Sequence, residues 1–331
     1  MTMPCNPSRL LRRTVALAAA AALLTGCGGA VPDHPGGAAT GSPTGGVAGL
    51  PPIQPVAASD SITDVRGRKI SVDRIPERVV CLVALCDDML TELGMVPAAT
   101  NSALLAHPRF LGPEKARKVP VIPGGFVSPE VEAILSHKPD LVIGLEDTHG
   151  KLAPALRGAT TFWAVQPTTW RDAVAYLRDL AALTHRGEAA VAAERRLRDK
   201  LLAAEKARSG KTALIVFGGD ENFGVAAPGR DVAAGLFPLI CDYPWEDRGI
   251  EGTYSLEEIL ARDVDVLFVE TIAFGATTGR LSEKMAGNPL WSRIPAVRNG
   301  KVIEVDPEVW AKGRGTRSLG IVLDEATAVL R

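Results

Sequence analysis

Apolar and polar residues succeed one another along most of the chain in a pattern that predicts alternating strands and helices. Continuous apolar runs at residues 78–84, 141–144 and 212–217 are typical of strands that are covered on both faces. Alternating positions on either side of Gly67, between residues 62 and 72, predict a β-hairpin. Because helical segments separate the apolar runs, the sequence predicts an α/β fold. Further elements are expected as strands at residues 119–122, 161–165 and 301–305 and as a closing helix at residues 316–330.

Residues 168–208 depart from this alternation and predict two consecutive helices. Thr168 or Thr169 can cap the first helix, which is expected to end at Leu183. Residues 188–208 contain neither Gly nor Pro, so the second helix is expected to be about 31 Å long at 1.5 Å per residue. Such a helix serves either as the surface helix of one domain or as a stiff strut between two lobes.

One unit of the sequence occurs twice and carries a glutamate at the same position in both copies. The first copy begins at Glu132 and the second at Glu257, and Asp140 and Asp265 match at the same offset. Each copy has the pattern of a short helix, a polar corner and a buried strand. The repeat predicts two lobes of similar construction, each with one acidic residue at an equivalent position. Such a pair suits docking on a two-fold symmetric partner.

The first 27 residues indicate export and membrane attachment. Arg9, Arg12 and Arg13 precede an apolar run at residues 15–24, which is too short to span a bilayer as a helix of about 20 residues. The run ends in Leu-Thr-Gly followed by Cys27, which resembles the lipoprotein signal of bacteria. We therefore expect residues 1–26 to be a signal peptide and Cys27 to carry the lipid. The alternative is an ordinary secretory signal that is cleaved nearby.

Composition then divides the remainder of the chain. Residues 27–58 are rich in Gly, Pro, Ala, Thr and Ser, and such a segment buries too little surface to offset its chain entropy, so a disordered tether is expected. The predicted organisation beyond it is an N-terminal lobe at residues 59–167, linking helices at residues 168–208 and a C-terminal lobe at residues 209–331.

Charge and cysteine content narrow the function further. Without the signal peptide the net charge is about −4, and no basic stripe suggests nucleic acid as a partner.

Beyond the signal and Cys27, the cysteines are Cys81, Cys86 and Cys241. Cys81 and Cys86 either pair or remain buried free thiols, and the sequence leaves both alternatives open.

Motifs of enzymes are absent from the sequence. It contains no Gly-x-Ser-x-Gly, P-loop or His-Glu-x-x-His pattern, so a secreted hydrolase is only a minor alternative. A metal site is also disfavoured, because no two histidines have ligand spacing. His107, Glu146, Asp147 and His149 are the one set that could converge in the first lobe, and we interpret them instead as solvated loop residues.

Four segments together resemble a known family, the class III periplasmic-type binding proteins of metal-chelate ABC importers. They are residues 64–80, the first glutamate unit from Glu132, the Thr-His-Arg-Gly corner at residues 184–187, and residues 288–302 followed by Val309-Trp310. The resemblance implies two Rossmann-like α/β lobes joined by a single long rigid helix. It also implies a ligand in the inter-lobe cleft, which in this family is a ferric siderophore, haem or cobalamin.

The resemblance further implies a role for the repeated glutamates. In the family, one glutamate of each lobe docks on arginines of a permease subunit, and the matching positions are Glu132 and Glu257. The alternative is structural, since acidic residues in a first turn stabilise the positive end of a helix. Glu258, not Glu257, fits the capping box opened by Ser255, which leaves Glu257 available to a partner.

Candidate ligand contacts follow from aromatic and arginine side chains after predicted strands. Ligands of α/β layers bind outside the carboxyl ends of strands, and a ferric chelate needs aromatic faces and Arg or Tyr donors rather than protein ligands to the iron. Trp163 and Trp291 are expected in the core. The predicted ligand-binding residues are Trp310, Arg314, Arg317, Arg230, Phe223, Tyr243 and Trp245.

The predicted function is that of a lipid-anchored extracytoplasmic receptor, a monomer, that captures a ferric siderophore and delivers it to an ABC permease. The chelate would be the transported ligand, and neither a cofactor nor an enzymatic activity is expected. Haem and cobalamin are the alternatives within the same family.

Overall fold

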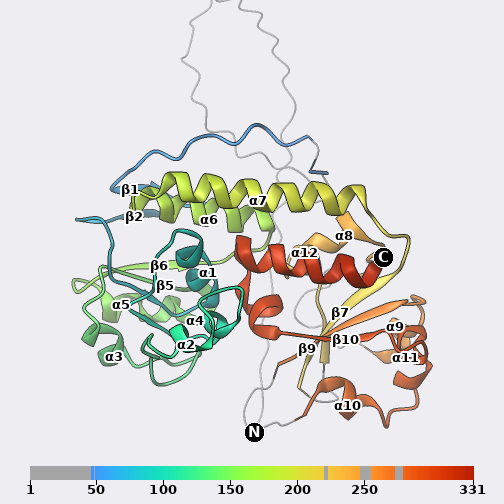
Figure 1. Cartoon of the computed structure of the whole chain (residues 1–331). Coiled ribbons are helices and arrows are strands. Elements are labelled where there is room, and N and C mark those ends of the chain that lie inside the picture. The colour runs from blue at the N-terminus through green and yellow to red at the C-terminus, as the bar shows by residue number, and fades with distance from the viewer. Residues whose placement is uncertain (1–45, 48, 220–222, 247–254, 273–278) are drawn as a thin grey trace, which may run out of the picture. The chain divides into compact units, whose positions relative to one another are not determined.

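The computed structural model describes residues 46–47, 49–219, 223–246, 255–272 and 279–331. These residues contain two four-stranded sheets, one in each half of the chain, and a two-stranded hairpin. The two halves are the N-lobe and the C-lobe of the molecule (Figure 1). The predicted α/β class and the two-lobe construction are confirmed.

All strands of the N-lobe sheet are parallel, in the order β4-β3-β5-β6. Every residue of the central strand β5 is buried, because helices cover both faces of a parallel sheet. The hairpin of β1 and β2 forms as expected around Gly67, whose φ is 76°. The strands are β1 (Ser61–Thr63), β2 (Lys69–Ser71), β3 (Val79–Cys81), β4 (Ala99–Thr100), β5 (Leu141–Leu145) and β6 (Thr161–Val165).

The C-lobe sheet has the order β10-β9-β7-β8, in which β10, β9 and β7 are parallel and β8 is antiparallel to β7. The sequence pattern predicted β7 and β10 but not the short edge strand β8. Gly224 of β8 lies against the ring of Phe217, which would be 2.5 Å from an added Cβ atom. The strands are β7 (Ala213–Gly218), β8 (Phe223–Val225), β9 (Val266–Thr271) and β10 (Val302–Val305).

Short helices lie between the strands of each lobe, and the longer helix α12 follows the last strand. Those of the N-lobe are α1 (Ala84–Glu92), α2 (Pro113–Ala116), α3 (Val131–Ser136), α4 (Glu146–His149) and α5 (Ala153–Leu156). Those of the C-lobe are α8 (Phe237–Ile240), α9 (Leu256–Leu260), α10 (Leu281–Met285), α11 (Pro295–Arg298) and α12 (Thr316–Leu330), with a π-helical turn at Glu308–Gly313 before α12.

Two long helices, α6 (Trp170–Leu183) and α7 (Gly187–Lys206), follow one another between the lobes. Of the two caps that the sequence left open, Thr169 is the one that caps α6, through a capping box with Asp172. Helix α7 runs past both lobes along their common side (Figure 1). Its buried Glu194 pairs with Arg178 of α6 and with Arg198 of α7 itself. The strut interpretation of the second helix is therefore correct.

Residues 49–58, here called the strap, lie along α6 and α7 (Figure 1). Arg198 donates to the carbonyl of Pro51 at 2.5 Å, and Arg178 donates to that of Gln54 at 2.9 Å. The carbonyl of Val56 approaches so closely that a Cβ atom at Gly187 would lie 2.2 Å from it. The disordered tether was predicted to extend to residue 58, but residues 49–58 are bound to α6 and α7. Side chains of these helices, rather than apolar side chains of the strap, make the contacts.

The repeated aspartates have the same structural role in both lobes. One carboxylate oxygen of Asp140 accepts from the backbone N–H of Arg78 at 2.9 Å, just before β3. Asp265 accepts from the N–H of Thr212 at 2.9 Å, just before β7. Each aspartate therefore fixes the entry of its lobe's first sheet strand beside the strand of the repeat.

Three cysteines have defined states. Cys81 and Cys86 form a disulfide that joins the end of β3 to α1, and Cys241 is a buried free thiol. This settles the two alternatives that the sequence left open.

Candidate functional site

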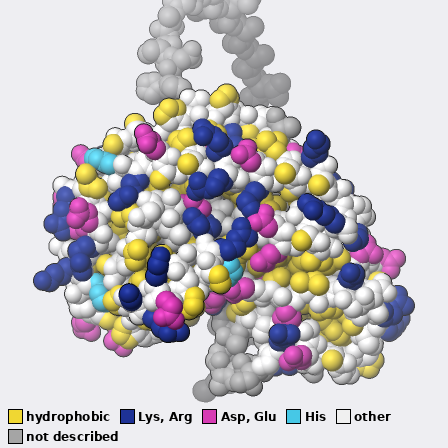
Figure 2. All heavy atoms as spheres, viewed as in Figure 1, with side chains coloured by type: hydrophobic (Ala, Val, Ile, Leu, Met, Phe, Trp, Pro, Cys, Tyr) yellow, Lys and Arg dark blue, Asp and Glu magenta, His cyan; other side chains and the backbone are white. Residues whose placement is uncertain are grey.

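The segments that follow the edge strands β4 and β10 of the two sheets meet at one place, here called the junction. The backbone N–H of Ala103, in the loop after β4, donates to Glu308 at 3.3 Å, and Glu308 opens the π-helical turn after β10. Acidic and basic side chains are interspersed over the face that includes this region (Figure 2). Since ligands of α/β sheets bind outside the carboxyl ends of strands, the junction is the candidate site.

A carboxylate of the N-lobe caps a helix of the C-lobe at this junction. Helix α12 has no side-chain cap of its own. Asp88 of α1 accepts instead from the backbone N–H groups of Arg317 at 3.1 Å and Ser318 at 2.8 Å, and from the Ser318 hydroxyl at 2.6 Å. A Cβ atom at Gly315 would lie 2.2 Å from the Asp88 carboxyl carbon. The lobes are therefore joined at α1–α12 as well as through α7.

The floor of the junction is acidic and buried. The Asp87 carboxylate accepts from the hydroxyls of Thr100 at 2.7 Å and Ser102 at 2.6 Å, while its other oxygen has no partner. Loss of solvation raises the pKa of Asp87, and likewise of Asp88, to about 7, against the hydrogen bonds that favour the ionised forms. These carboxyl groups therefore titrate near neutral pH.

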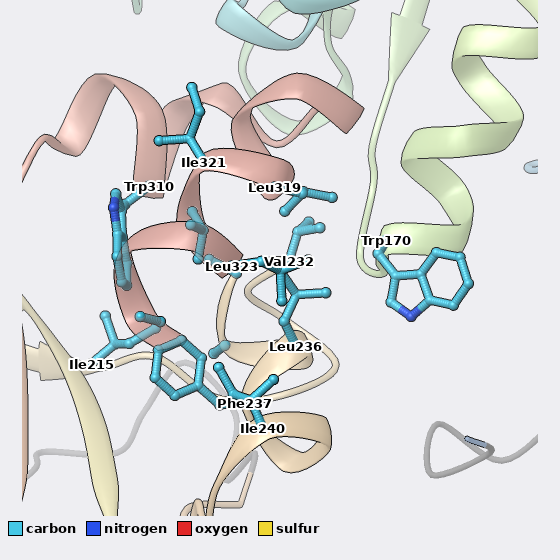
Figure 3. Close-up of a cluster of buried hydrophobic side chains, with 14 of the residues drawn as sticks. Trp170, Ile215, Val232, Leu236, Phe237, Ile240, Trp310, Leu319, Ile321 and Leu323 are labelled. Atoms are coloured by element: carbon cyan, nitrogen blue, oxygen red, sulfur yellow. The ribbon is translucent and has the colours of Figure 1, made fainter. Parts of the chain in front are cut away.

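Trp310 does not contact the junction surface, which corrects the prediction of a ligand-binding role. Its side chain is 1% exposed and stacks on Phe268, with 5.1 Å between the ring centres. Its indole N–H donates to Glu325 at 2.7 Å. Figure 3 shows the ring inside the core beside Ile215 and Phe237. The π-helical turn after β10 directs this side chain inward, and the residue pattern does not reveal that turn.

Tyr243 and Trp245 also belong to the structure of the C-lobe. The Tyr243 hydroxyl donates to the carbonyl of Ala226 at 2.6 Å and accepts from the N–H of Ile215 at 3.2 Å. Trp245 is 3% exposed and lies under the guanidinium of Arg262, 4.3 Å from its ring centre. The two aromatic residues line a cavity of about 380 Å³ beside Arg262, not the junction.

Arg317 spans the junction rather than remaining open to a ligand. Its guanidinium forms an ion pair with Glu92 of α1 at 3.2 Å and donates to the carbonyl of Arg109 at 3.0 Å. Arg314 is half-buried, has a left-handed φ of 57°, and donates to the carbonyl of Ala311 at 2.9 Å. Its charge opposes the increase in pKa that burial imposes on the carboxyl of Glu270.

The other two predicted ligand contacts lie in the C-lobe. Phe223 is half-buried and meets Trp291 edge-on, with 6.2 Å between ring centres. Arg230 is exposed, two residues after Pro228. Trp163 and Trp291 are buried, as expected.

The two glutamates of the repeat occupy equivalent places. Glu132 is the second residue of α3 and Glu257 the second residue of α9, and both are exposed. Within the described part of the chain, neither carboxylate has a hydrogen-bonding or ionic partner. Ser255 caps α9 by accepting from the N–H of Glu258 at 3.3 Å, which confirms Ser255 as the cap. The cap therefore does not use Glu257.

Sequence reasoning missed residues 123–130, here called the rim loop. The loop carries two exposed apolar side chains, Phe126 at 43% and Val127 at 60% exposure. Asn101, directly after β4, donates to the carbonyl of Gly125 at 2.8 Å. The loop thus lies at the carboxyl end of the N-lobe sheet. The only sequence signal was its Gly-Gly-Phe-Val composition immediately before the first glutamate unit.

His149 was interpreted as a solvated loop residue, and this is wrong. Its side chain is 0% exposed, and both ring nitrogens bind backbone groups. The ring is therefore unavailable to a metal. Within the described residues, no group of three or more His, Cys, Asp or Glu side chains could hold a metal ion. No helix among them is long and apolar enough to cross a bilayer.

Comparison with known proteins agrees with this architecture. Residues 79–309 match the sequence profile of the family described as periplasmic binding protein. A probable siderophore-binding lipoprotein of Bacillus subtilis is 25% identical over 287 residues, covering 80% of this chain and 86% of the relative.

Solved structures show the same fold. The triscatecholate siderophore binding protein of Bacillus subtilis, complexed with ferri-bacillibactin, matches 82% of this chain and 98% of its own, with a TM-score of 0.69 at 19% identity. The periplasmic catecholate-siderophore binding protein from Vibrio cholerae matches 80% and 98%, with a TM-score of 0.62 at 19% identity.

Proposed function

This chain belongs to the periplasmic binding protein family, and on that premise we propose that it is an extracytoplasmic receptor for a ferric siderophore. The observation that carries the proposal is the contact between two similar sheets, where the segments that follow their edge strands β4 and β10 meet. The names of the relatives support the ligand class, since each one described above is named as a siderophore-binding protein. The family consists of binding proteins, so capture rather than turnover is proposed.

Exposed and half-buried side chains of the two lobes suit such a ligand. A ferric siderophore presents oxygen atoms to arginine donors and apolar edges to aromatic faces. On the C-lobe we propose Arg314, Arg230 and Phe223 as contacts, and on the N-lobe the exposed ring of Phe126. The chelator fills the coordination sphere of the iron, so no protein ligand to the metal is required.

We also propose that Glu132 and Glu257 dock on the two subunits of an ABC permease. Support comes from their equivalent, exposed positions at the starts of α3 and α9.

Cys27, which lies outside the described residues, is proposed to carry a lipid. A Cys27→Ser variant should then fold normally and leave the membrane fraction, and its retention there would refute the anchor.

The ligand class is tested with the soluble form that starts after Cys27. Ferric hydroxamate, ferric catecholate, ferric citrate, haem and cobalamin are titrated separately while tryptophan fluorescence is recorded. One ferric siderophore should bind with micromolar or tighter affinity, and its iron-free form should bind more weakly, because only the ferric complex is preorganised. Haem or cobalamin binding alone would reassign the ligand. Failure of all five to bind would reject the receptor function.

A further inference from the structure

The side chain of His149 joins two parts of the N-lobe that are far apart in sequence. The backbone N–H of Leu145, at the end of β5, donates to Nδ1 of His149 at 2.9 Å. The other nitrogen, Nε2, lies 2.6 Å from the carbonyl oxygen of Phe126 in the rim loop. A carbonyl only accepts, so Nε2 carries the proton and the neutral ring uses both of its nitrogens.

The ring is packed as well as hydrogen-bonded. It meets the ring of Phe126 edge-on, with 5.0 Å between ring centres. On its other side, a Cβ atom at Gly144 would lie 2.8 Å from the Cβ of His149, so only glycine fits there. Burial lowers the pKa of His149, in agreement with a neutral ring. His149 is therefore a fixed spacer between β5 and the rim loop.

The rim loop is a closed turn with few other attachments. The backbone N–H of Glu130 donates to the carbonyl of Pro123 at 3.0 Å, which closes the loop on itself. Gly124 has a φ of +87°, and a Cβ atom there would lie 2.2 Å from the carbonyl oxygen of Ser128. Besides His149, the side chain of Asn101 holds the loop through the carbonyl of Gly125. Two side chains thus fix the loop at the carboxyl ends of β4 and β5.

The rim loop also leads directly into the proposed docking helix. Glu130 is the N-cap of α3, and Glu132 is the second residue of that helix. Phe126 and Val127, on the same loop, expose large apolar side chains at the carboxyl end of the sheet. The position of Phe126 therefore determines the position of Glu132, because only a few residues of a closed turn separate the two.

We propose that His149 is a positioning residue that fixes the rim loop, so that Phe126 contacts the ligand while Glu132 is presented to the permease. The proposal rests on the proposed function. The apolar face of the ferric chelate binds the exposed side chains of Phe126 and Val127. Ligand capture and docking then share one loop, and His149 supports both.

The test compares His149→Leu, which removes both hydrogen bonds, with His149→Gln, which can still donate to the carbonyl of Phe126. Phe126→Ala is the matched control, because it removes the ligand contact and leaves the hydrogen bonds of His149 in place. Loss of a buried hydrogen-bond pair should weaken ferric-siderophore binding by His149→Leu roughly tenfold. His149→Gln should recover part of that loss.

Uptake at saturating ligand separates positioning from ligand contact. His149→Leu should still import poorly, because Glu132 is displaced, whereas Phe126→Ala should import almost normally once saturated. Normal uptake by a saturated His149→Leu receptor, or identical behaviour of the two variants, would overturn the proposal.

Hydrogen exchange provides a readout that does not depend on any ligand. The amide of Glu130 should exchange faster in His149→Leu than in the natural chain, and also faster than in Phe126→Ala, which keeps both hydrogen bonds of His149. Unchanged exchange would reject His149 as the support of the loop. Faster exchange without any chelate binding by the natural chain would instead reject the receptor function alone.

Discussion

At the scale of single residues, Asp88 determines how the two lobes are joined. Its carboxylate occupies the place of a helix N-cap, although it comes from the other lobe. The first N–H groups of a helix have no partner within the helix, and Gly315 leaves the room in which Asp88 satisfies them. Arg317, next to this cap, adds an ion pair with Glu92 across the same boundary. The start of α12 is therefore completed only when the lobes meet.

Replacement of Asp88 should show the energy of this cap. Asp88→Ala should lower the free energy of unfolding by about 1–3 kcal/mol, because it removes a cap and leaves buried N–H groups unpaired. Asp88→Asn should lower it less, since the amide oxygen still accepts. Denaturant titration of both variants measures the difference. Equal stability of Asp88→Ala and the natural chain would show that water replaces the cap without cost.

Asp87 should make stability depend on pH. Its pKa is raised by burial to about 7 from an ordinary value of 3.8, with Asp88 and Glu308 adding unfavourable negative charge. Between these two values the folded state binds more protons than the unfolded state, so stability falls as pH rises. The free energy of unfolding should therefore decrease between about pH 4 and pH 7. Asp87→Asn should reduce that slope, and a slope identical to that of the natural chain would contradict the assignment.

The same residues show what could be predicted from the sequence. The pattern placed strands and helices well, because buried parallel strands and capped helices leave local signals. It could not tell which way a side chain points after a strand ends. Trp310 and Phe126 both follow sheet segments, yet the first is enclosed by a π-helical turn and the second is exposed by a glycine turn. His149 was missed because its two partners are backbone groups, which have no sequence signature.

At the scale of elements, the strap is held on α6 and α7 by side chains that belong to these helices. The strap offers backbone carbonyls, and Arg178 and Arg198 bind them while the buried Glu194 holds both guanidinium groups in place. Composition suggested disorder because the strap itself has few large apolar residues. Its order is supplied by partners far away in the sequence, so a composition argument could not detect it.

Removal of the strap should destabilise the folded unit. A chain that starts at Ser59 should have a melting temperature several degrees lower than one that starts at Gly46, because four or more contacts along α6 and α7 are lost. Arg198→Ala in the longer chain should reproduce part of the decrease. Calorimetry of the three proteins checks this, and equal melting temperatures would show that the strap is bound too weakly to matter.

At the scale of the whole molecule, the repeat gives each lobe one exposed glutamate at the same place. Surface ion pairs contribute only about 0–1 kcal/mol each, so a single docking contact has little effect on affinity. Two contacts on separate lobes define the orientation of the receptor on a two-fold symmetric partner. The proposed docking role therefore depends on both glutamates together.

Uptake by glutamate variants tests this docking. Glu132→Ala and Glu257→Ala should each reduce uptake of the ferric chelate, the double variant should reduce it further, and ligand affinity should stay unchanged in all three. Glu188→Ala is a matched control, because Glu188 is also an exposed acid in the first turn of a helix. Normal import by the double variant would return both residues to a structural role at helix starts.

If the chain is exported as proposed, the cap on α12 also has a consequence for how it folds afterwards. A chain that crosses a membrane from its N-terminus releases Asp88 long before Ser318, which follows 230 residues later. Until α12 has emerged, Asp88 in the N-lobe lacks the N–H groups of Arg317 and Ser318 that it binds in the native structure. Until α12 packs on the N-lobe, its first N–H groups lack the carboxylate of Asp88. Each lobe should therefore become fully stable only when the other is present, so we expect the last increment of stability to come in one late step. Unfolding should accordingly be a single transition shared by both lobes.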